Sequence, residues 1–153
     1  MKKIYIAYGS NMDLDQMEWR CPGARLLAKG ELKDWRLMFK GSLTGSYATI
    51  EREKGQTVPV LLWEVTPADE AALDIYEGFP RFYYKKTILV QNVEYFGKGK
   101  TKGSCLNGMV YIMHEERKLG HPTAGYYDLL ADAYDEFGFD RDILEEALLY
   151  SKP

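Results

Sequence analysis

The sequence contains few residues of the kinds that form disulfides or bind metal ions. Only two cysteines, Cys21 and Cys105, occur among its 153 residues, and they lie far apart without a CxxC pair. This spacing argues against a disulfide framework and indicates two free, buried thiols in a reducing compartment. The two histidines, His114 and His121, lack the spacing and the neighbouring cysteines of a zinc site. We therefore expect no metal and no cofactor.

The sequence also lacks an excess of basic residues and a long apolar run. Its 20 lysines and arginines are outnumbered by 23 aspartates and glutamates, which gives a net charge of −3. Nucleic-acid binding requires a basic excess or stripe, so we expect no nucleic-acid partner. No apolar run approaches the ~20 residues of a membrane span. The apolar stretch within residues 1–7 is too short for a signal peptide. We expect a cytoplasmic protein with no membrane partner.

Apolar and aromatic residues are abundant. Hydrophobic residues make up 46% of the sequence and aromatic residues 14%, and there are twelve tyrosines. This composition and length predict a single domain, residues 1–153, with one core. Tyrosine combines an apolar ring with a polar hydroxyl, so it suits both the walls of a cleft and the rim of a core. Composition alone leaves both interpretations open.

Alternating apolar residues and helix-capping signals predict the secondary structure. The signals place strands at 3–8, 47–51, 58–65, 82–90 and 104–113, an extended stretch at 24–39, a turn at 54–56, and helices at 13–20, 66–76, 122–137 and 141–150. Thr66 and Asp69 form a capping-box pattern around Pro67, which fits the first helical position. Residues 58–65 have a continuous apolar middle, so we expect that strand to be buried on both faces. Strands dominate the middle and helices the end, which predicts an α+β fold whose mixed sheet curls into a barrel.

The first candidate site is the segment Tyr8-Gly9-Ser10-Asn11, between the first strand and the first helix. Glycine allows a ligand to approach the backbone closely. Consecutive N–H groups at such a turn can converge on an anion. The alternative is an ordinary turn, in which Gly9 bends the chain and Asn11 or Asp13 caps the helix.

The second candidate is Glu77, which follows Tyr76 and precedes Gly78 and Phe79 at the end of a predicted helix. A carboxylate pressed against apolar surface has a raised pKa, as a catalytic base or acid near neutral pH requires. The alternative is a solvated glutamate without a chemical role.

Four segments occur together in one order: Tyr8 to Asn11, Leu73 to Gly78, Tyr83 to Lys86, and Pro122 to Tyr126. In combination they resemble the γ-glutamylcyclotransferase-like superfamily, which includes the avirulence-induced-gene-like proteins of plants. The resemblance covers about residues 3 to 138. It implies a small mixed β-barrel flanked by helices, with the cavity at one mouth of the barrel.

The resemblance also implies which residues form the site. The family's catalytic glutamate falls on Glu77, and the aromatic residue seven positions later falls on Tyr84, which would contact the substrate. The anion-binding loop of the family falls on Tyr8, Gly9, Ser10 and Asn11. After Tyr84, where close relatives often have arginine, this chain has Lys85 and Lys86.

The implied reaction is intramolecular aminolysis of a small γ-glutamyl compound. The α-amine attacks the γ-carbonyl of the same glutamyl group, which forms 5-oxoproline and releases a free amine or amino acid. Glu77 would transfer both protons, and the loop would hold the α-carboxylate or the oxyanion. Arg36, Arg52 and Arg81 are candidate partners for a substrate carboxylate. The alternative is a protein on the same scaffold that binds a small carboxylate metabolite without turnover.

Overall fold

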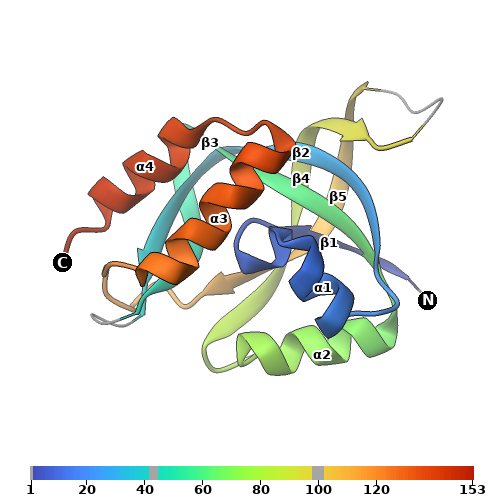
Figure 1. Ribbon diagram of the computed structural model, residues 1–153, viewed down its shortest axis with the longest axis horizontal. Helices are drawn as coiled ribbons and strands as arrows, with labels where there is room; N and C mark the ends of the chain where they lie inside the picture. The colour runs from blue at the N-terminus through green and yellow to red at the C-terminus, as the bar shows by residue number, and fades with distance from the viewer. Residues whose placement is uncertain (1, 42–44, 98–101) are drawn as a thin grey trace.

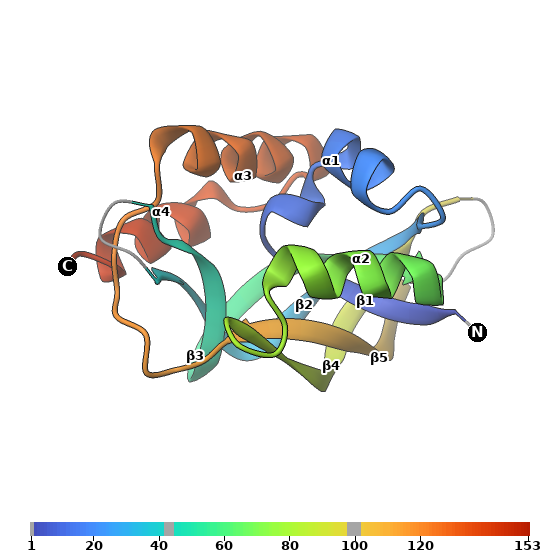
Figure 2. The ribbon, with the colours of Figure 1, turned by 90° about the horizontal axis from the view of Figure 1, so that it is seen from below.

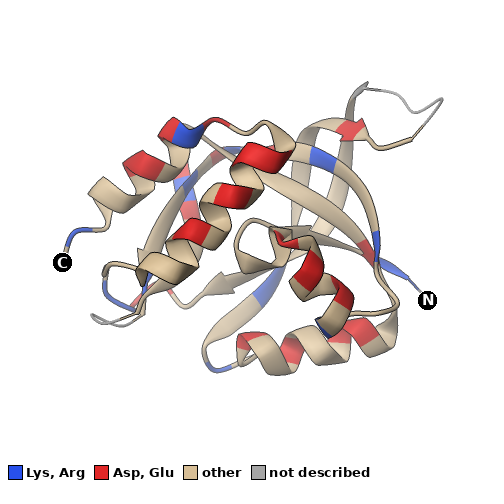
Figure 3. Ribbon diagram, viewed as in Figure 1, with Lys and Arg blue, Asp and Glu red and all other residues tan. Residues whose placement is uncertain are grey.

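The computed structural model describes residues 2–41, 45–97 and 102–153, which form a ring of strands with helices packed around one mouth (Figures 1 and 2). The strands are β1 (Lys3–Ala7), β2 (Arg25–Lys40), β3 (Tyr47–Val65), β4 (Tyr83–Tyr95) and β5 (Lys102–Met113). The helices are α1 (Leu14–Arg20), α2 (Pro67–Glu77), α3 (Ala124–Phe137) and α4 (Arg141–Tyr150), with a 3₁₀ turn, η1 (Ser10–Met12), before α1. Acidic positions, red in Figure 3, recur along α1, α2 and α3.

The sheet closes on itself in the order β1-β3-β2-β4-β5, because β5 returns to the side of β1. The pairs along this order are antiparallel, whereas β1 and β5 run parallel and pair at Tyr5 and Met109. The predicted α+β class, with a mixed sheet flanked by helices, is confirmed.

Strand β3 corrects one prediction. The sequence predicts two strands separated by a turn at 54–56, but residues 47–65 form one continuous strand that pairs with β2. The pairing register shifts near Asp34 and Gly55, which have φ angles of 66° and 89°. The Gly55 N–H donates to Asp34 Oδ1 at 2.9 Å. A β-bulge thus absorbs the glycine conformation that the sequence suggested was a turn.

The core fills the interior of the ring and continues beneath α3 and α4. The predicted burial of residues 58–65 on both faces is confirmed, since within this segment only Glu64 is partly exposed. Cys21 is buried, as expected, but the prediction is wrong for Cys105, which is exposed. Along β5, partly buried Ser104 and Leu106 alternate with exposed Cys105 and Asn107, so the Cys105 side chain lies on the outward face of the strand.

Helix α2 is fixed at both ends, and this places Glu77. Thr66 Oγ1 accepts from the Asp69 N–H at 3.1 Å, and Asp69 Oδ2 accepts from the Thr66 N–H at 3.0 Å, so the predicted capping box is present. Gly78 ends the helix in the left-handed conformation, with φ of 65°. Glu77 is therefore the last residue of α2, at the point where the chain turns toward β4.

In the described residues, no helix has both the length and the apolar character needed to cross a membrane.

Candidate active site

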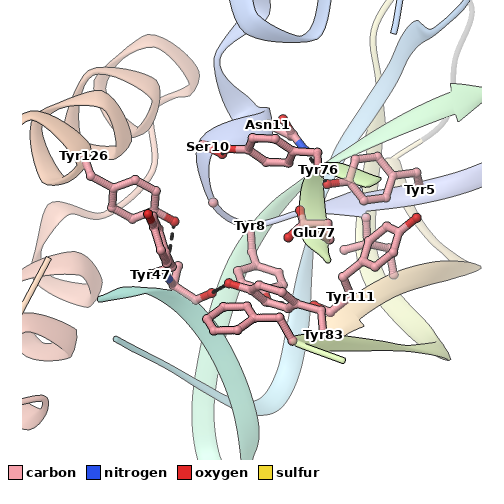
Figure 4. A pocket seen from close by; sticks show the side chains of 14 residues that line it. Tyr5, Tyr8, Ser10, Asn11, Tyr47, Tyr76, Glu77, Tyr83, Tyr111 and Tyr126 are labelled. Carbon is pink, nitrogen blue, oxygen red and sulfur yellow. Dashed lines mark hydrogen bonds between the residues drawn. The ribbon is translucent and has the colours of Figure 1, made fainter. Parts of the chain in front are cut away.

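A cavity of about 210 Å³ opens at the mouth of the ring, between η1, the end of α2 and the start of α3 (Figure 4). Seven of the twelve tyrosines line it: Tyr5, Tyr8, Tyr47, Tyr76, Tyr83, Tyr111 and Tyr126. Glu77 is the one charged residue among the described residues of its lining. Of the two interpretations of the tyrosine-rich composition, the cleft wall accounts for these seven.

The Glu77 carboxylate projects into this cavity and lies among the rings of Tyr5, Tyr8, Tyr76 and Tyr111 (Figure 4). The side chain is partly buried, and within the described ranges no group donates a hydrogen bond to its carboxylate. Removal from water raises the pKa of Glu77 to about 7, against a smaller lowering effect of the Arg20 charge. At neutral pH this carboxyl group can therefore either accept or donate a proton.

The loop Tyr8-Gly9-Ser10-Asn11 lines the same cavity as Glu77. Gly9 lies so close to α3 that a Cβ atom at this position would be 3.2 Å from the Tyr126 hydroxyl. The backbone N–H groups of Gly9, Ser10 and Asn11 find no acceptor among residues 2–41, 45–97 and 102–153. The structure thus brings together two segments separated by more than 60 residues. It leaves the N–H groups of the loop and the carboxylate of Glu77 available to a ligand.

Asn11 does not cap the first helix. Asp13 does so, with Oδ2 accepting from the Gln16 N–H at 3.2 Å. The Asn11 side chain instead donates from Nδ2 to the Tyr5 hydroxyl at 2.9 Å, and Ser10 Oγ lies 2.9 Å from the Tyr76 hydroxyl. Both side chains therefore help to build the cavity.

Two of the tyrosine hydroxyls have their hydrogens committed to the backbone. Tyr8 donates to the carbonyl of Tyr111 at 2.6 Å, and Tyr83 donates to the carbonyl of Ala48 at 2.8 Å. These bonds fix the two rings against the strands that carry their acceptors. Tyr8 and Tyr83 shape the floor of the cavity and have no free hydrogen for a ligand.

Two other hydroxyls only accept from the protein. Tyr5 accepts from Asn11 Nδ2, and Tyr126 accepts from the Ala48 N–H at 3.1 Å. A phenol carries one donor hydrogen as well as its acceptor sites, so each of these two hydroxyls keeps its hydrogen free. Burial raises both pKa values well above their ordinary range, which keeps both groups protonated. The cavity therefore offers two O–H donors beside Glu77.

Tyr84, the second tyrosine of β4, lies apart from the other predicted site residues. It does not line the cavity, and its hydroxyl donates to the Glu115 carboxylate. Successive side chains of a strand point to opposite faces, and on β4 the inward one is Tyr83. The alternation of Tyr83 and Tyr84 at the start of the strand is the signal that could have identified Tyr83.

The three arginines considered as carboxylate partners lie outside the cavity lining. Arg36 lies over the Tyr150 ring at 4.4 Å, and Arg52 lies over the Trp35 ring at 4.9 Å. The cation that affects Glu77 is Arg20, at the end of α1, and no sequence pattern indicated this residue. Within the described parts of the chain, no three histidine, cysteine, aspartate or glutamate side chains form a cluster suited to a metal ion.

The model of the family "Gamma-glutamyl cyclotransferase, AIG2-like" matches residues 5–129. The chain belongs to this family. This range contains both the loop and Glu77, and it extends into α3.

Curated relatives agree with this membership. The human and mouse proteins named gamma-glutamylcyclotransferase are 33% and 30% identical to this chain over 82 residues. Each match covers 49% of this chain and 44% of the relative, so the chain is matched over less than half the length of either protein.

Solved structures share the fold. A structure named gamma-glutamyl cyclotransferase superimposes on the whole chain and on 89% of its own length, with a TM-score of 0.78 and 24% identity. A glutathione-specific gamma-glutamyl cyclotransferase from yeast covers 99% of this chain and 97% of its own, with a TM-score of 0.66 and 10% identity. At these identities the comparison establishes the fold alone.

Proposed function

We propose that this protein is a γ-glutamyl cyclotransferase, which converts a γ-glutamyl amine or amino acid into 5-oxoproline and the free amine. One observation carries the proposal: Glu77, a carboxylate of raised pKa without a partner among the described residues, faces the same cavity as the loop Tyr8-Gly9-Ser10-Asn11. Membership of the family supports the reaction class. The chemistry needs no metal or cofactor, because nucleophile and electrophile belong to one substrate.

The cavity would hold the glutamyl group folded, with its α-amine beside its γ-carbonyl. Such positioning replaces a bimolecular encounter with an intramolecular attack, which lowers the barrier by several kcal/mol, up to ~10 in favourable cases. Glu77 accepts a proton from the α-ammonium, and the freed amine attacks the γ-carbonyl carbon. The attacking nitrogen then still carries one proton more than a lactam nitrogen. As the tetrahedral intermediate collapses, the C–N bond to the leaving amine breaks and Glu77 returns its proton to that nitrogen, while the ring nitrogen loses its extra proton to the leaving amine or to solvent. The carboxylate is then ready for another cycle.

The negative charge of the substrate or of the intermediate needs hydrogen-bond donors. The backbone N–H groups of Gly9, Ser10 and Asn11 and the free hydroxyl hydrogens of Tyr5 and Tyr126 supply them. These donors can serve the α-carboxylate or the tetrahedral oxyanion, since both accept N–H and O–H bonds. Their low-polarity surroundings of aromatic rings strengthen such bonds.

Glu77 favours the enzyme over a protein that merely binds a carboxylate metabolite. An ionised carboxylate in the cavity repels a simple anionic ligand, and its desolvation destabilises the fold. A γ-glutamyl substrate brings an ammonium group that pairs with Glu77 and a carboxylate that the donors can bind. The arrangement therefore suits a zwitterionic head group that must lose a proton.

The experiment compares the γ-L-glutamyl and α-L-glutamyl derivatives of one amine and measures 5-oxoproline by chromatography. We expect release from the γ-isomer only, because the α-isomer cannot place its amine against the scissile carbonyl in the same orientation. A panel of leaving amines, with glutathione included, then ranks the second half of the substrate. Equal turnover of the two isomers would refute the proposed recognition of the γ-glutamyl group.

A further inference from the structure

Arg20 lies behind the wall of the cavity and contacts two of the residues that form it. Its guanidinium carbon is 3.4 Å from the centroid of the Tyr76 ring, and its Nη1 donates to Asn11 Oδ1. A third contact, from Nη2 to Gln16 Oε1 at 3.3 Å, joins the guanidinium to its own helix. Arg20 therefore links α1 to the anion-binding loop and to the end of α2.

The contact with Asn11 fixes the direction of a chain of hydrogen bonds. Arginine can only donate, so the Asn11 atom that faces it must be the amide oxygen. The amide nitrogen then faces Tyr5, and the Tyr5 hydroxyl must accept from it, at 2.9 Å. The hydroxyl hydrogen of Tyr5 is left for the cavity. Without Arg20 the amide could turn over, and Tyr5 would then lose its hydrogen to the Asn11 oxygen.

The contact with Tyr76 acts on the residue next to Glu77. Arginine and tyrosine stacked at this distance attract one another through the ring's negative face. The Tyr76 hydroxyl is also 2.9 Å from Ser10 Oγ, so the ring is held on its face and at its tip. Tyr76 is 44% exposed, and these contacts restrain it beside the cavity. The last turn of α2, which carries Glu77, is restrained with it.

The charges around Glu77 leave Arg20 as the cation that acts on it. The titratable groups that line the cavity with Glu77 are the tyrosines Tyr5, Tyr8, Tyr47, Tyr76, Tyr83, Tyr111 and Tyr126. Asp74 and Lys85, which do not line the cavity, pair with one another at 2.9 Å. A positive charge near a carboxylate favours its ionised form. The Arg20 charge lowers the pKa of Glu77, in opposition to desolvation.

We infer that Arg20 is a positioning residue for this site: through Asn11 it orients the Tyr5 hydroxyl as a donor to the cavity, and through Tyr76 it restrains the end of α2 that carries Glu77. The Arg20 charge adds an electrostatic effect on the Glu77 carboxylate. The inference rests on the proposed function of the Glu77 cavity. Arg20 does not line the cavity and so acts on the substrate only through Asn11, Tyr5, Tyr76 and Glu77.

The first test measures the titration of Glu77 in the substrate-free protein by carbon-13 NMR of glutamate carboxyls. The Glu77 signal is assigned by its absence in Glu77→Gln. We expect Arg20→Gln to move the midpoint to higher pH, because it removes the cation, and Arg20→Lys to keep it close to wild type. Arg141→Gln is the matched control, since Arg141 pairs with Asp135 on the surface at 3.0 Å. An unchanged midpoint in Arg20→Gln would overturn the electrostatic part.

The second test is a double-mutant cycle on kcat/KM with Arg20→Gln and Tyr5→Phe. Each single change should lower kcat/KM on the order of 10-fold, the effect of about one hydrogen bond. If Arg20 acts through Tyr5, kcat/KM of the double variant should lie no more than about threefold below that of the less active single variant. Losses that multiply would overturn the positioning path.

Two further results keep these tests decisive. If Arg20→Gln does not fold, Arg20→Lys replaces it in the cycle, because lysine keeps the charge but loses the planar guanidinium that bonds to Asn11 and stacks on Tyr76. If wild-type protein releases no 5-oxoproline, the proposed function fails, and the NMR titration still decides whether Arg20 controls Glu77.

Discussion

The carboxylates of helix α2 fall into two kinds, which differ in their ion pairing and in their pKa values. Glu70 and Asp74 lie in what we term the outer charge cluster, with Lys3 and Lys85. Lys85 Nζ is 2.8 Å from Glu70 and 2.9 Å from Asp74, and Lys3 Nζ is 3.0 Å from Glu70. Glu77 lies two turns after Glu70, at the end of the same helix, where its side chain faces the cavity, and no described cation pairs with it. Hydrogen bonds from Lys85 and Lys3 lower the pKa of Glu70, whereas desolvation raises that of Glu77 to about 7.

The difference shows what an ion pair would remove from the site. A lysine beside Glu77 would lower its pKa and make it a poor base near neutral pH. Lys85 is the nearest lysine by sequence, but its ammonium group is bound to Asp74 and Glu70, and it does not line the cavity. Tyr111 connects the two regions, since it lines the cavity and its hydroxyl donates to Asp74. The outer charge cluster thus keeps a cation out of the cavity and anchors one of its walls.

The largest expected effect is the loss of turnover in Glu77→Gln. Glutamine is nearly isosteric but cannot accept the ammonium proton, and loss of general acid–base help costs ~10²- to 10⁴-fold in rate. Wild-type kcat/KM should also fall as the pH drops below about 7, where Glu77 becomes protonated, and the variant should lack this acid limb. Steady-state 5-oxoproline release from pH 5 to 9 measures both.

Glu70→Gln is the control for this comparison, because it removes a carboxylate of the same helix from the outer charge cluster. Its rate should stay within about threefold of wild type, with the acid limb intact. If Glu77→Gln also stayed in that range, Glu77 would not be the general base.

Glu77→Gln should also stabilise the fold at alkaline pH. The folded pKa of Glu77, about 7, lies above its ordinary value of 4.5, so ionisation is disfavoured in the folded state. The contribution of Glu77 to the free energy of unfolding is therefore fully present below about pH 4.5 and is lost as the pH rises through 7. Glu77→Gln should therefore gain on the order of 1 to 3 kcal/mol at pH 8 and nothing at pH 4. Urea unfolding at the two pH values measures the difference, and an equal effect at both would show that Glu77 is not desolvated.

A smaller effect separates the two tyrosines at the start of β4. Tyr83→Phe leaves the Ala48 carbonyl without its donor in the cavity wall and should lower kcat/KM by about 10-fold. Tyr84→Phe removes a contact to Glu115 on the outer face and should stay within about twofold. Melting temperatures of both variants control for folding. A larger loss in Tyr84→Phe than in Tyr83→Phe would return Tyr84 to the site.

These tyrosines also show how far the sequence could predict the site. Glu77 and the loop Tyr8 to Asn11 were identifiable because each has a local signature: a glycine after a strand, and a carboxylate among aromatic residues at a helix end. Tyr83 was identifiable in principle, since strand alternation decides which of two adjacent side chains faces inward. The family resemblance assigns Tyr84 by its position seven residues after Glu77, which takes no account of this alternation.

Other features depend on contacts that no local pattern contains. Arg20 acts on Glu77 only because α1 packs against the end of α2, and Tyr126 reaches the cavity from α3 by a hydrogen bond to Ala48. The class of the fold followed from local patterns, since capping residues and alternation define each element. The continuity of β3 did not, because Gly55 adopts the conformation of a turn within a paired strand.

The smallest expected effect concerns Lys85, which pairs with Glu70 and Asp74 in the outer charge cluster. Lys85→Gln removes the counterion of Glu70 and Asp74, and for partly exposed pairs we expect a loss of about 1 kcal/mol or less in unfolding free energy. The loss should shrink in ~1 M salt, where screening already weakens such pairs. Turnover should fall by no more than about threefold, because Lys85 supports the cavity only through Asp74 and Tyr111.

Lys86→Gln, at the exposed next position, is the matched control. Urea unfolding at low and high salt, with 5-oxoproline release measured in parallel, tests these expectations. A rate loss in Lys85→Gln comparable to that of Glu77→Gln would mean that Lys85 acts on the substrate itself, and that the separation between the cavity and the outer charge cluster does not hold.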